Sequence, residues 1–259
     1  MAYIDREGCL LHYELIGDAG LPVLVFSNSL GSNLTMWEPQ IEALISHFRL
    51  LRYDTRGHGK SSITPGPYTI EQLGRDVLYL LDVLEIEQAN FCGLSMGGLI
   101  GQWLAIHAAS RLHKLVLANT AAKIGAEEVW NARIATVLRE GLTPIIPGTL
   151  ERWFTAGFRV AQPGVVATIE AMLQSADPQG YAANCAAIRD ADFRTALHAI
   201  HTPTLVIVGA RDPSTTPEDG RFLAKHIGDS QYVELPAAHL SNVEAANGFN
   251  AALLGFLSH

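Results

Sequence analysis

Cysteine and long apolar runs are both scarce in this sequence. The three cysteines, Cys9, Cys92 and Cys185, are odd in number and far apart, and none stands in a C-x-x-C or Cys/His spacing. Such a set predicts neither a disulfide framework nor a zinc site, so we expect no metal. No stretch approaches the ~18 continuous apolar residues that a membrane-spanning helix needs. We therefore expect no membrane partner.

Clustered positive charge is missing as well. The chain has 18 Lys and Arg against 26 Asp and Glu, which gives a net charge of −8. Nucleic acids and anionic membranes both reward clustered Lys and Arg, so we expect neither as a partner. Residues 1–7 lack the basic start and apolar stretch of a secretory leader, which favours a cytoplasmic location.

Short apolar runs and helical patterns alternate along both ends of the chain. With 259 residues, 48% of them hydrophobic, the chain can form one large α/β domain or a core domain with an insertion. The patterns predict strands over residues 3–5, 9–15, 23–26, 48–53, 89–92, 114–119, 204–209 and 231–235, and helices over 37–45, 70–84, 99–109, 217–226 and 242–257. Such an alternation predicts a mostly parallel eight-stranded sheet flanked by helices.

The alternation stops in the middle of the chain. From about residue 121 to 192 the pattern is helical and irregular, and proline and glycine interrupt it repeatedly. We therefore expect an α/β core domain of residues 1–120 and 196–259, with residues 121–195 inserted as a helical cap. We refer to residues 121–195 as the cap segment.

The stretch Gly93–Gly98 reads G-x-S-x-G and has one more glycine behind it. It falls between an expected strand and an expected helix, where a serine must adopt a strained turn that leaves no room for side chains two residues away on either side. This pattern predicts that Ser95 is an exposed nucleophile and that the N–H of Met96, at the helix start, points at the atom it attacks. From the motif alone, a glycine-rich turn with an incidental serine is the alternative.

Two more reactive residues follow expected strands. Functional groups gather at the carboxyl ends of the strands in a parallel sheet, where Asp212 and His239 also fall. A serine needs a base to take its proton, and an imidazole needs a carboxylate to fix its tautomer, so we predict a triad of Ser95, His239 and Asp212. A turn role for Asp212 and a capping or core role for His239 are the alternatives.

Other candidates for the acid and the base are weaker. Asp219 and Asp229 lie in or after an expected helix, away from the carboxyl end of a strand. His58 stands between two glycines in the loop after Asp54, and we expect it to shape that loop.

Three segments carry a resemblance to a known family. The segments are Ser27-Asn28-Ser29-Leu30-Gly31, Asp54-Thr55-Arg56-Gly57-His58-Gly59 and the motif around Ser95. With them the chain resembles the α/β-hydrolase superfamily over nearly its whole length, although most members carry His-Gly where this chain has Asn28-Ser29. Together with Trp130-Asn131-Ala132-Arg133-Ile134, these segments look like those of the 3-oxoadipate enol-lactonases of the protocatechuate branch of aromatic catabolism.

This resemblance implies an α/β-hydrolase fold and a reaction. Such an enzyme opens 3-oxoadipate enol-lactone, a small lactone that bears a carboxymethyl group, to give 3-oxoadipate. Ser95 would form an acyl-enzyme with His239 as its base, and the oxyanion would lie between the backbone N–H groups of Leu30 and Met96. No metal or organic cofactor is implied.

The carboxylate of that substrate needs a cationic partner, for which an enclosed arginine is best suited. We choose Arg133, because none of its neighbours three or four positions away on a helix is acidic, and Trp130 one turn earlier would wall the same pocket. Arg152 and Arg159 also lack local acids and are the alternatives. We expect the cap segment and the Asn28-Ser29 loop to decide which substrate is accepted.

Two other functions are compatible with the same residues. One is a carboxylesterase or other acyl hydrolase that uses the same triad on a neutral ester. The other is a receptor with a hydrolase fold that binds a small molecule and turns it over slowly, which fold alone does not distinguish. The sequence says nothing about oligomeric state.

Overall fold

An eight-stranded sheet runs through the protein, whose computed structural model describes residues 2–258. The order across the sheet is β1-β2-β4-β3-β5-β6-β7-β8, with β1, β2 and β4 paired antiparallel and all other neighbours parallel. The strands are β1 (Ala2–Arg6), β2 (Cys9–Ile16), β3 (Val23–Ser27), β4 (Arg49–Tyr53), β5 (Ala89–Leu94), β6 (Leu112–Ala118), β7 (Thr204–Gly209) and β8 (Ser230–Leu235). The mostly parallel eight-stranded sheet is confirmed.

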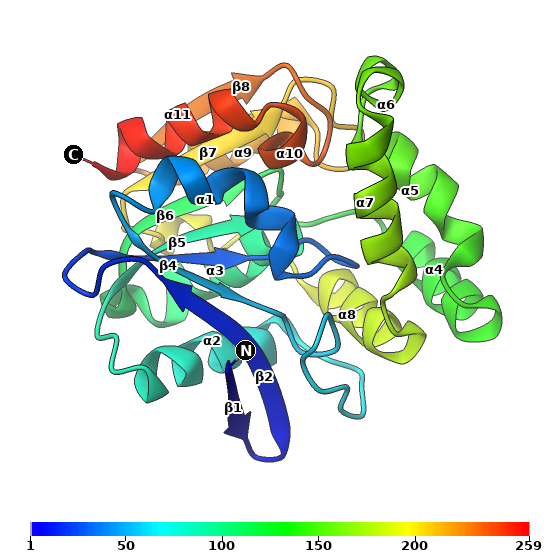
Figure 1. The fold of residues 1–259 in the computed structure, drawn as a ribbon, viewed down its shortest axis with the longest axis horizontal. Coiled ribbons are helices and arrows are strands. Elements are labelled where there is room, and N and C mark those ends of the chain that lie inside the picture. Colours follow the sequence, from blue (N-terminus) through cyan, green and yellow to red (C-terminus); the bar gives the residue numbers. More distant parts are fainter. Residues whose placement is uncertain (1, 259) are drawn as a thin grey trace.

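Helices cover both faces of this sheet (Figure 1). The helices outside the cap segment are α1 (Glu38–Leu44), α2 (Ile70–Val83), α3 (Met96–His107), α9 (Pro217–His226), α10 (Ser241–Glu244) and α11 (Ala246–Leu257). Helix α3 packs on β5, β6 and α2, whereas α1 packs against α11 on the face nearer the viewer in Figure 1. No helix in residues 2–258 has both the length and the apolar character to span a membrane.

Two expected helices differ from the observed ones. Helix α3 begins at Met96, three residues before the expected start at Leu99, because the glycines after Ser95 already belong to its first turn. The closing helix is divided into α10 and α11 at Ala245, whose φ of −122° and ψ of 44° leave the helical region. Neither proline nor glycine stands at this break, so the sequence pattern did not show it.

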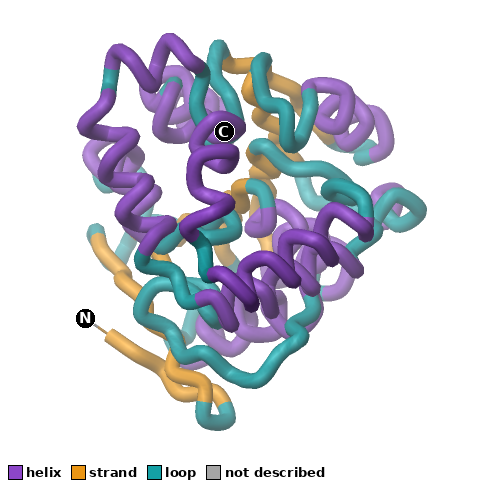
Figure 2. Tube along the Cα trace, turned by 90° about the vertical axis from the view of Figure 1, so that its right-hand side faces the viewer, coloured by secondary structure: helices purple, strands orange, loops and turns teal. Residues whose placement is uncertain are grey.

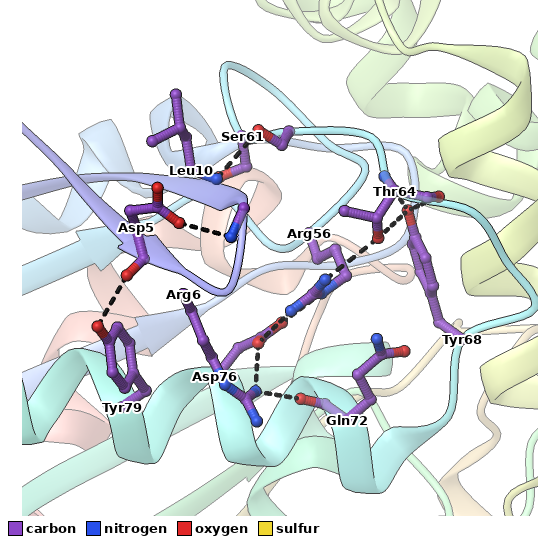
Figure 3. Close-up of polar contacts among 12 residues, drawn as sticks. Asp5, Arg6, Leu10, Arg56, Ser61, Thr64, Tyr68, Gln72, Asp76 and Tyr79 are labelled. Atoms are coloured by element: carbon purple, nitrogen blue, oxygen red, sulfur yellow. Dashed lines mark hydrogen bonds and ion pairs between the residues drawn. The ribbon is translucent and has the colours of Figure 1, made fainter.

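Two ion pairs that share Asp76 of α2 connect the N-terminal hairpin to the loop after β4 (Figure 3). Asp76 on α2 is 1% exposed, and its Oδ1 accepts hydrogen bonds from Arg6 (2.5 Å) and Arg56 (2.6 Å). The hydrogen bond from Arg56 to Asp76 raises the pKa of Arg56 above its ordinary value. The ion pair of Arg56 with Asp76 therefore holds the loop that contains His58 against helix α2.

Five helices form the cap segment, between β6 and β7. They are α4 (Glu127–Glu140), α5 (Ile146–Trp153), α6 (Ala156–Ala161), α7 (Pro163–Gln174) and α8 (Pro178–Asp190), and residues 121–195 contain no strand. They lie together at the right-hand side of Figure 1, and Figure 2 shows this side with helices in front of the sheet. The division into a core domain and a cap domain is our proposal.

Helix α8 makes close contact with the loop after β4. The side chain of Asn184 donates a hydrogen bond to the carbonyl of Arg56 (2.8 Å), and Tyr68 N–H donates to the carbonyl of Ala183 (3.2 Å). A Cβ added to Gly180 would lie 2.2 Å from the carbonyl oxygen of Gly57. The two backbones thus touch at a pair of glycines, which fixes α8 over the carboxyl end of the sheet.

Candidate active site

Ser95 occupies a strained turn between β5 and α3. Its φ is 59° and its ψ is −112°, a left-handed conformation that non-glycine residues seldom adopt. A Cβ at Gly93 would lie 2.1 Å from the carbonyl oxygen of Gly97, and one at Gly97 would lie 2.2 Å from that of Ser27. The glycines on both sides of Ser95 are therefore required by close backbone contacts, as the motif predicts.

The loop after β3 lies directly against this turn. Gly97 N–H donates a hydrogen bond of 3.1 Å to the carbonyl of Asn28. The Asn28 side chain is fully buried, donating to the carbonyl of Tyr53 (2.8 Å) and accepting from Trp37 (2.9 Å). Asn28 therefore braces the loop, and of the Asn28-Ser29 pair only Ser29 lines the cavity beside Ser95. The side chain of Asn28 is bonded in the core, so Ser29 and Leu30 are the residues of this loop that face the cavity. That this loop contributes to substrate choice stays a prediction.

Hydrogen bonds fix the backbone on either side of Leu30. In the loop, Gly31 N–H donates to Nε2 of His58 (2.7 Å) and Ser29 N–H to Sδ of Met36 (3.5 Å), on either side of Leu30. Met96 is the first residue of α3, so its N–H has no acceptor within its own helix. Leu30 also lines the cavity that contains Ser95. Through the hydrogen bond from Gly31, His58 fixes the loop after β3 as well as its own loop after β4.

Asp212 and His239 form a buried pair at the ends of β7 and β8. Nδ1 of His239 lies 2.7 Å from Oδ2 of Asp212, and both residues are 3% exposed. The same Oδ2 accepts hydrogen bonds from Asn119 (2.9 Å) and from the hydroxyl of Thr215 (2.7 Å). Oδ1 accepts from the backbone N–H of Ser214 (2.7 Å). Asp212 is thus supplied with donors on both oxygens.

These donors decide the charge of Asp212. Burial by itself would raise its pKa, but the positive charge and hydrogen bond of His239, with the hydrogen bonds of Asn119 and Thr215, bring the pKa below its ordinary value. An ionised carboxylate beside Nδ1 favours the tautomer of His239 that leaves Nε2 free to accept a proton. Asn119 and Thr215 were missed by the sequence reasoning, although Asn119 directly follows β6 and the strand-end criterion would have found it.

The weaker acid candidates serve other purposes. Asp219 accepts hydrogen bonds from the backbone and hydroxyl of Thr216 and forms a capping box at the start of α9. The backbone carbonyl of Asp229 accepts from Thr204 N–H as β7 begins. Neither residue lines the cavity beside Ser95.

A cavity of about 160 Å³ brings the candidate residues together from the core and the cap segment. The core contributes Ser29, Leu30, Ser95, Ser214 and His239, and the cap segment contributes Ile124, Gly125, Val129, Trp130, Arg133, Thr149, Arg152, Trp153, Tyr181 and Ile188. Neither Asp nor Glu is among these residues. A larger hollow of about 560 Å³ between α4, α8 and residues 63–67 contains none of Ser95, Asp212 and His239.

Two arginines face this small cavity. Arg133 lies with its guanidinium carbon 5.1 Å from the centre of the Trp130 ring, a cation–π contact, while Arg152 donates to the hydroxyl of Thr149 (3.0 Å). Burial, and then the charge of Arg133, lower the pKa of Arg152. Within residues 2–258 neither arginine takes part in an ion pair. Two unneutralised cations in one small cavity favour an anionic ligand.

The third arginine considered from the sequence is placed elsewhere. Arg159 contacts Glu151 at 4.0 Å and does not line the cavity. Arg152 is therefore as good a candidate as Arg133 for binding a substrate carboxylate. The lack of acidic neighbours in the sequence did not distinguish Arg152 from Arg159. Trp130 lines the cavity as expected, and its indole N–H donates to the carbonyl of Ile124 (2.6 Å).

The combined arrangement is suited to acyl transfer on a small anion. A serine on a strained turn and a histidine whose Nδ1 contacts a carboxylate line one cavity, and these are groups that attack on a carbonyl requires. Residues 2–258 contain no group of three or more His, Cys, Asp or Glu side chains placed to hold a metal ion.

Comparisons with known proteins agree with this geometry. Residues 22–149 match the family model described as alpha/beta hydrolase fold. The chain is 50% identical over 250 residues to 3-oxoadipate enol-lactonase 2 of Acinetobacter baylyi, covering 96% of this chain and 94% of that protein. Among solved structures, it resembles the enol-lactonase from Burkholderia xenovorans, with a TM-score of 0.98 and 48% identity over 100% of both chains. It also resembles a thermophilic esterase from Thermogutta terrifontis with malate bound, with a TM-score of 0.93 and 31% identity over 100% of this chain and 98% of the other.

Proposed function

The chain belongs to the alpha/beta hydrolase family and is a hydrolase, and we propose that it hydrolyses 3-oxoadipate enol-lactone to 3-oxoadipate in aromatic catabolism. The observation that supports the choice of substrate is the pair Arg133 and Arg152, which line the cavity of Ser95 while no Asp or Glu lines it. A small lactone with a carboxymethyl group supplies the missing negative charge. The similarity to enol-lactonases over almost the whole chain supports the same choice.

In the proposed mechanism, Ser95 is the nucleophile, His239 the base and Asp212 the acid of the triad. His239 takes the proton of the Ser95 hydroxyl as the oxygen adds to the lactone carbonyl. Asp212, ionised and 2.7 Å from Nδ1, stabilises the imidazolium that forms. The strained turn at Ser95 holds its hydroxyl toward the cavity without reorganisation during the reaction.

The negative charge that develops on the carbonyl oxygen is bound by the N–H groups of Leu30 and Met96. Both belong to backbone fixed by the contacts around Asn28 and Gly97, so the donors are in place before the charge appears. Collapse of the adduct cleaves the ring bond and expels an enolate, which takes the proton that His239 received from Ser95 and becomes a ketone, so that His239 is again a neutral base. Water activated by His239 then hydrolyses the acyl-enzyme and releases 3-oxoadipate. No step requires a cofactor.

A neutral-ester hydrolase is the second candidate, favoured by the similarity to the Thermogutta terrifontis esterase. The two candidates differ in what Arg133 and Arg152 do. For the enol-lactone they bind the substrate carboxylate, whereas for a neutral ester they have no ionic partner in the cavity.

The test is a spectrophotometric assay of 3-oxoadipate enol-lactone loss beside a panel of neutral lactones and esters of similar size. We expect kcat/KM for the enol-lactone to exceed that of the neutral compounds by roughly 10- to 100-fold, the worth of a hydrogen-bonded charge in an enclosed site. Faster turnover of the neutral esters would assign the protein to that second class instead. Very slow turnover of every compound, with a ligand-dependent partner, would indicate a receptor.

A further inference from the structure

The backbone around His239 is bonded to the cap segment. His239 N–H donates to the carbonyl of Arg152 (3.4 Å), and Leu240 N–H donates to the carbonyl of Trp153 (3.1 Å). Both acceptors belong to the last turn of α5, whose carbonyls have no partner within the helix. Arg152 and Trp153 are also residues that line the cavity. Arg152 and Trp153 thus line the cavity while their backbone carbonyls accept hydrogen bonds from His239 and Leu240.

Glu244 reinforces this junction from the other side. Its Oε2 accepts hydrogen bonds from the N–H of Ala238 (2.9 Å), directly before His239, and from the N–H of Thr155 (3.2 Å), two residues after Trp153. Its Oε1 accepts from the hydroxyl of Thr155 in a short contact. One carboxylate therefore ties the residue before His239 to the segment that leaves α5.

The chemistry of these contacts requires a carboxylate at position 244. Every group that approaches its two oxygens is an N–H or O–H donor, so an ionised carboxylate satisfies all of them at once. An amide of the same shape presents an NH₂ group to one of those donors and loses that contact. Charge-assisted hydrogen bonds of this kind are about twice as strong as neutral ones.

We propose that Glu244 is a positioning residue that acts through the backbone of Ala238 and His239, so that the end of α5 and Glu244 together hold the imidazole in line with Ser95. The inference rests on the proposed role of His239 as the base. It adds that the position of this base depends on the cap segment as well as on Asp212. Loss of the Glu244 carboxylate frees the loop on one side while the contact between His239 and Asp212 remains.

The experiment measures how fast Ser95 reacts with a neutral 4-nitrophenyl phosphonate, a probe that needs the base but no carboxylate partner. Glu244→Gln and Glu244→Ala are compared with Glu42→Gln, which changes an exposed glutamate on α1. We expect Glu244→Gln and Glu244→Ala to slow phosphonylation and to lower kcat for the enol-lactone by about tenfold or more, with KM within about twofold of wild type. Glu42→Gln should behave as wild type.

Thr155 provides an independent variant at the same junction. Thr155→Val removes the hydroxyl that Glu244 accepts and should slow phosphonylation in the same direction, whereas Thr155→Ser keeps the hydroxyl and should restore the rate. A wild-type phosphonylation rate in both Glu244 variants, with only a lower melting temperature, would overturn the proposal and leave Glu244 a purely structural residue.

The same measurements distinguish a wrong substrate assignment from a wrong role for Glu244. If wild-type protein reacts with the phosphonate but leaves the enol-lactone intact, the proposed substrate is wrong, and slower phosphonylation in the Glu244 variants still supports the positioning role. If the wild-type serine does not react with the phosphonate at all, the role of His239 and with it that of Glu244 are overturned.

Discussion

The backbone N–H of Gly31 donates a 2.7 Å hydrogen bond to Nε2 of His58. The imidazole accepts this bond only while Nε2 carries no proton, and burial lowers the pKa of His58 to about 4. Gly31 directly follows Leu30, whose N–H is a proposed oxyanion donor. A neutral His58 therefore holds one side of the proposed oxyanion site in place.

This contact predicts a pH dependence of stability. The pKa of His58 is about 4 in the folded protein and 6.5 as a free group. Between pH 4 and pH 6.5 the unfolded chain therefore binds more protons than the folded protein does. The free energy of unfolding should therefore rise with pH across this window, and His58 should contribute up to ~1.4 kcal/mol per pH unit. This contribution is lost as pH falls through the window. Urea unfolding at several pH values checks this, and His58→Gln should show a shallower dependence. An unchanged slope in the variant would contradict it.

The proposed triad predicts a loss of activity without a loss of fold. Ser95→Ala and His239→Ala should each reduce turnover of the enol-lactone and of a neutral ester by roughly 10⁴-fold or more. Their far-UV circular dichroism should match that of the wild type, since neither change removes backbone contacts. Substantial residual activity in both purified variants would refute the assignment.

The two arginines predict an effect that depends on substrate charge. Arg133→Ala and Arg152→Ala should each raise KM for the anionic enol-lactone by roughly 10- to 100-fold, because a hydrogen-bonded ion partner is lost. KM for a neutral ester should change less than about threefold. Arg159→Ala is the matched control, since Arg159 belongs to the same segment but lies outside the cavity. An equal rise for both substrates would show that the arginines do not bind the carboxylate.

The contact between Gly57 and Gly180 predicts a strong difference between two glycine substitutions. Gly180→Ala should destabilise the protein by about 2 to 4 kcal/mol, because the added carbon meets the carbonyl oxygen of Gly57 at 2.2 Å. Gly164→Ala, in helix α7 with nothing within 4 Å, should be neutral or stabilising by up to ~1 kcal/mol. Urea denaturation of both variants measures the difference. Equal stabilities would mean that α8 shifts freely on the loop.

Features that depend on local backbone geometry were predicted from the sequence, although the catalytic roles of these residues stay predictions. Gly93, Ser95 and Gly97 follow from the turn that a strand and a helix impose when they meet at a serine, and the structure shows the contacts that require them. Asp212 and His239 followed from their positions after strands, and they lie 2.7 Å apart. Each of these predictions needed only a pattern within about ten neighbouring residues.

Residues whose role depends on distant contacts were missed or ranked too low. Asn119 bonds to Asp212, 93 positions later, and Glu244 bonds to Thr155, 89 positions earlier. Arg152 and Arg159 looked alike from their neighbours in sequence, yet only Arg152 faces the cavity. Such distinctions depend on how helices pack on one another, which helical periodicity does not specify.

By itself the sequence determined the order of strands and helices and the reactive turn at Gly93–Gly98, because hydrophobic periodicity and glycine requirements are local. Only the tertiary structure decided that Arg152 joins Arg133 in the cavity and that Glu244 and the end of α5 hold the loop of His239. The physical reason is that the cap segment meets the carboxyl ends of the strands through backbone and side-chain hydrogen bonds between distant residues. Those bonds exist only once both parts have folded against each other.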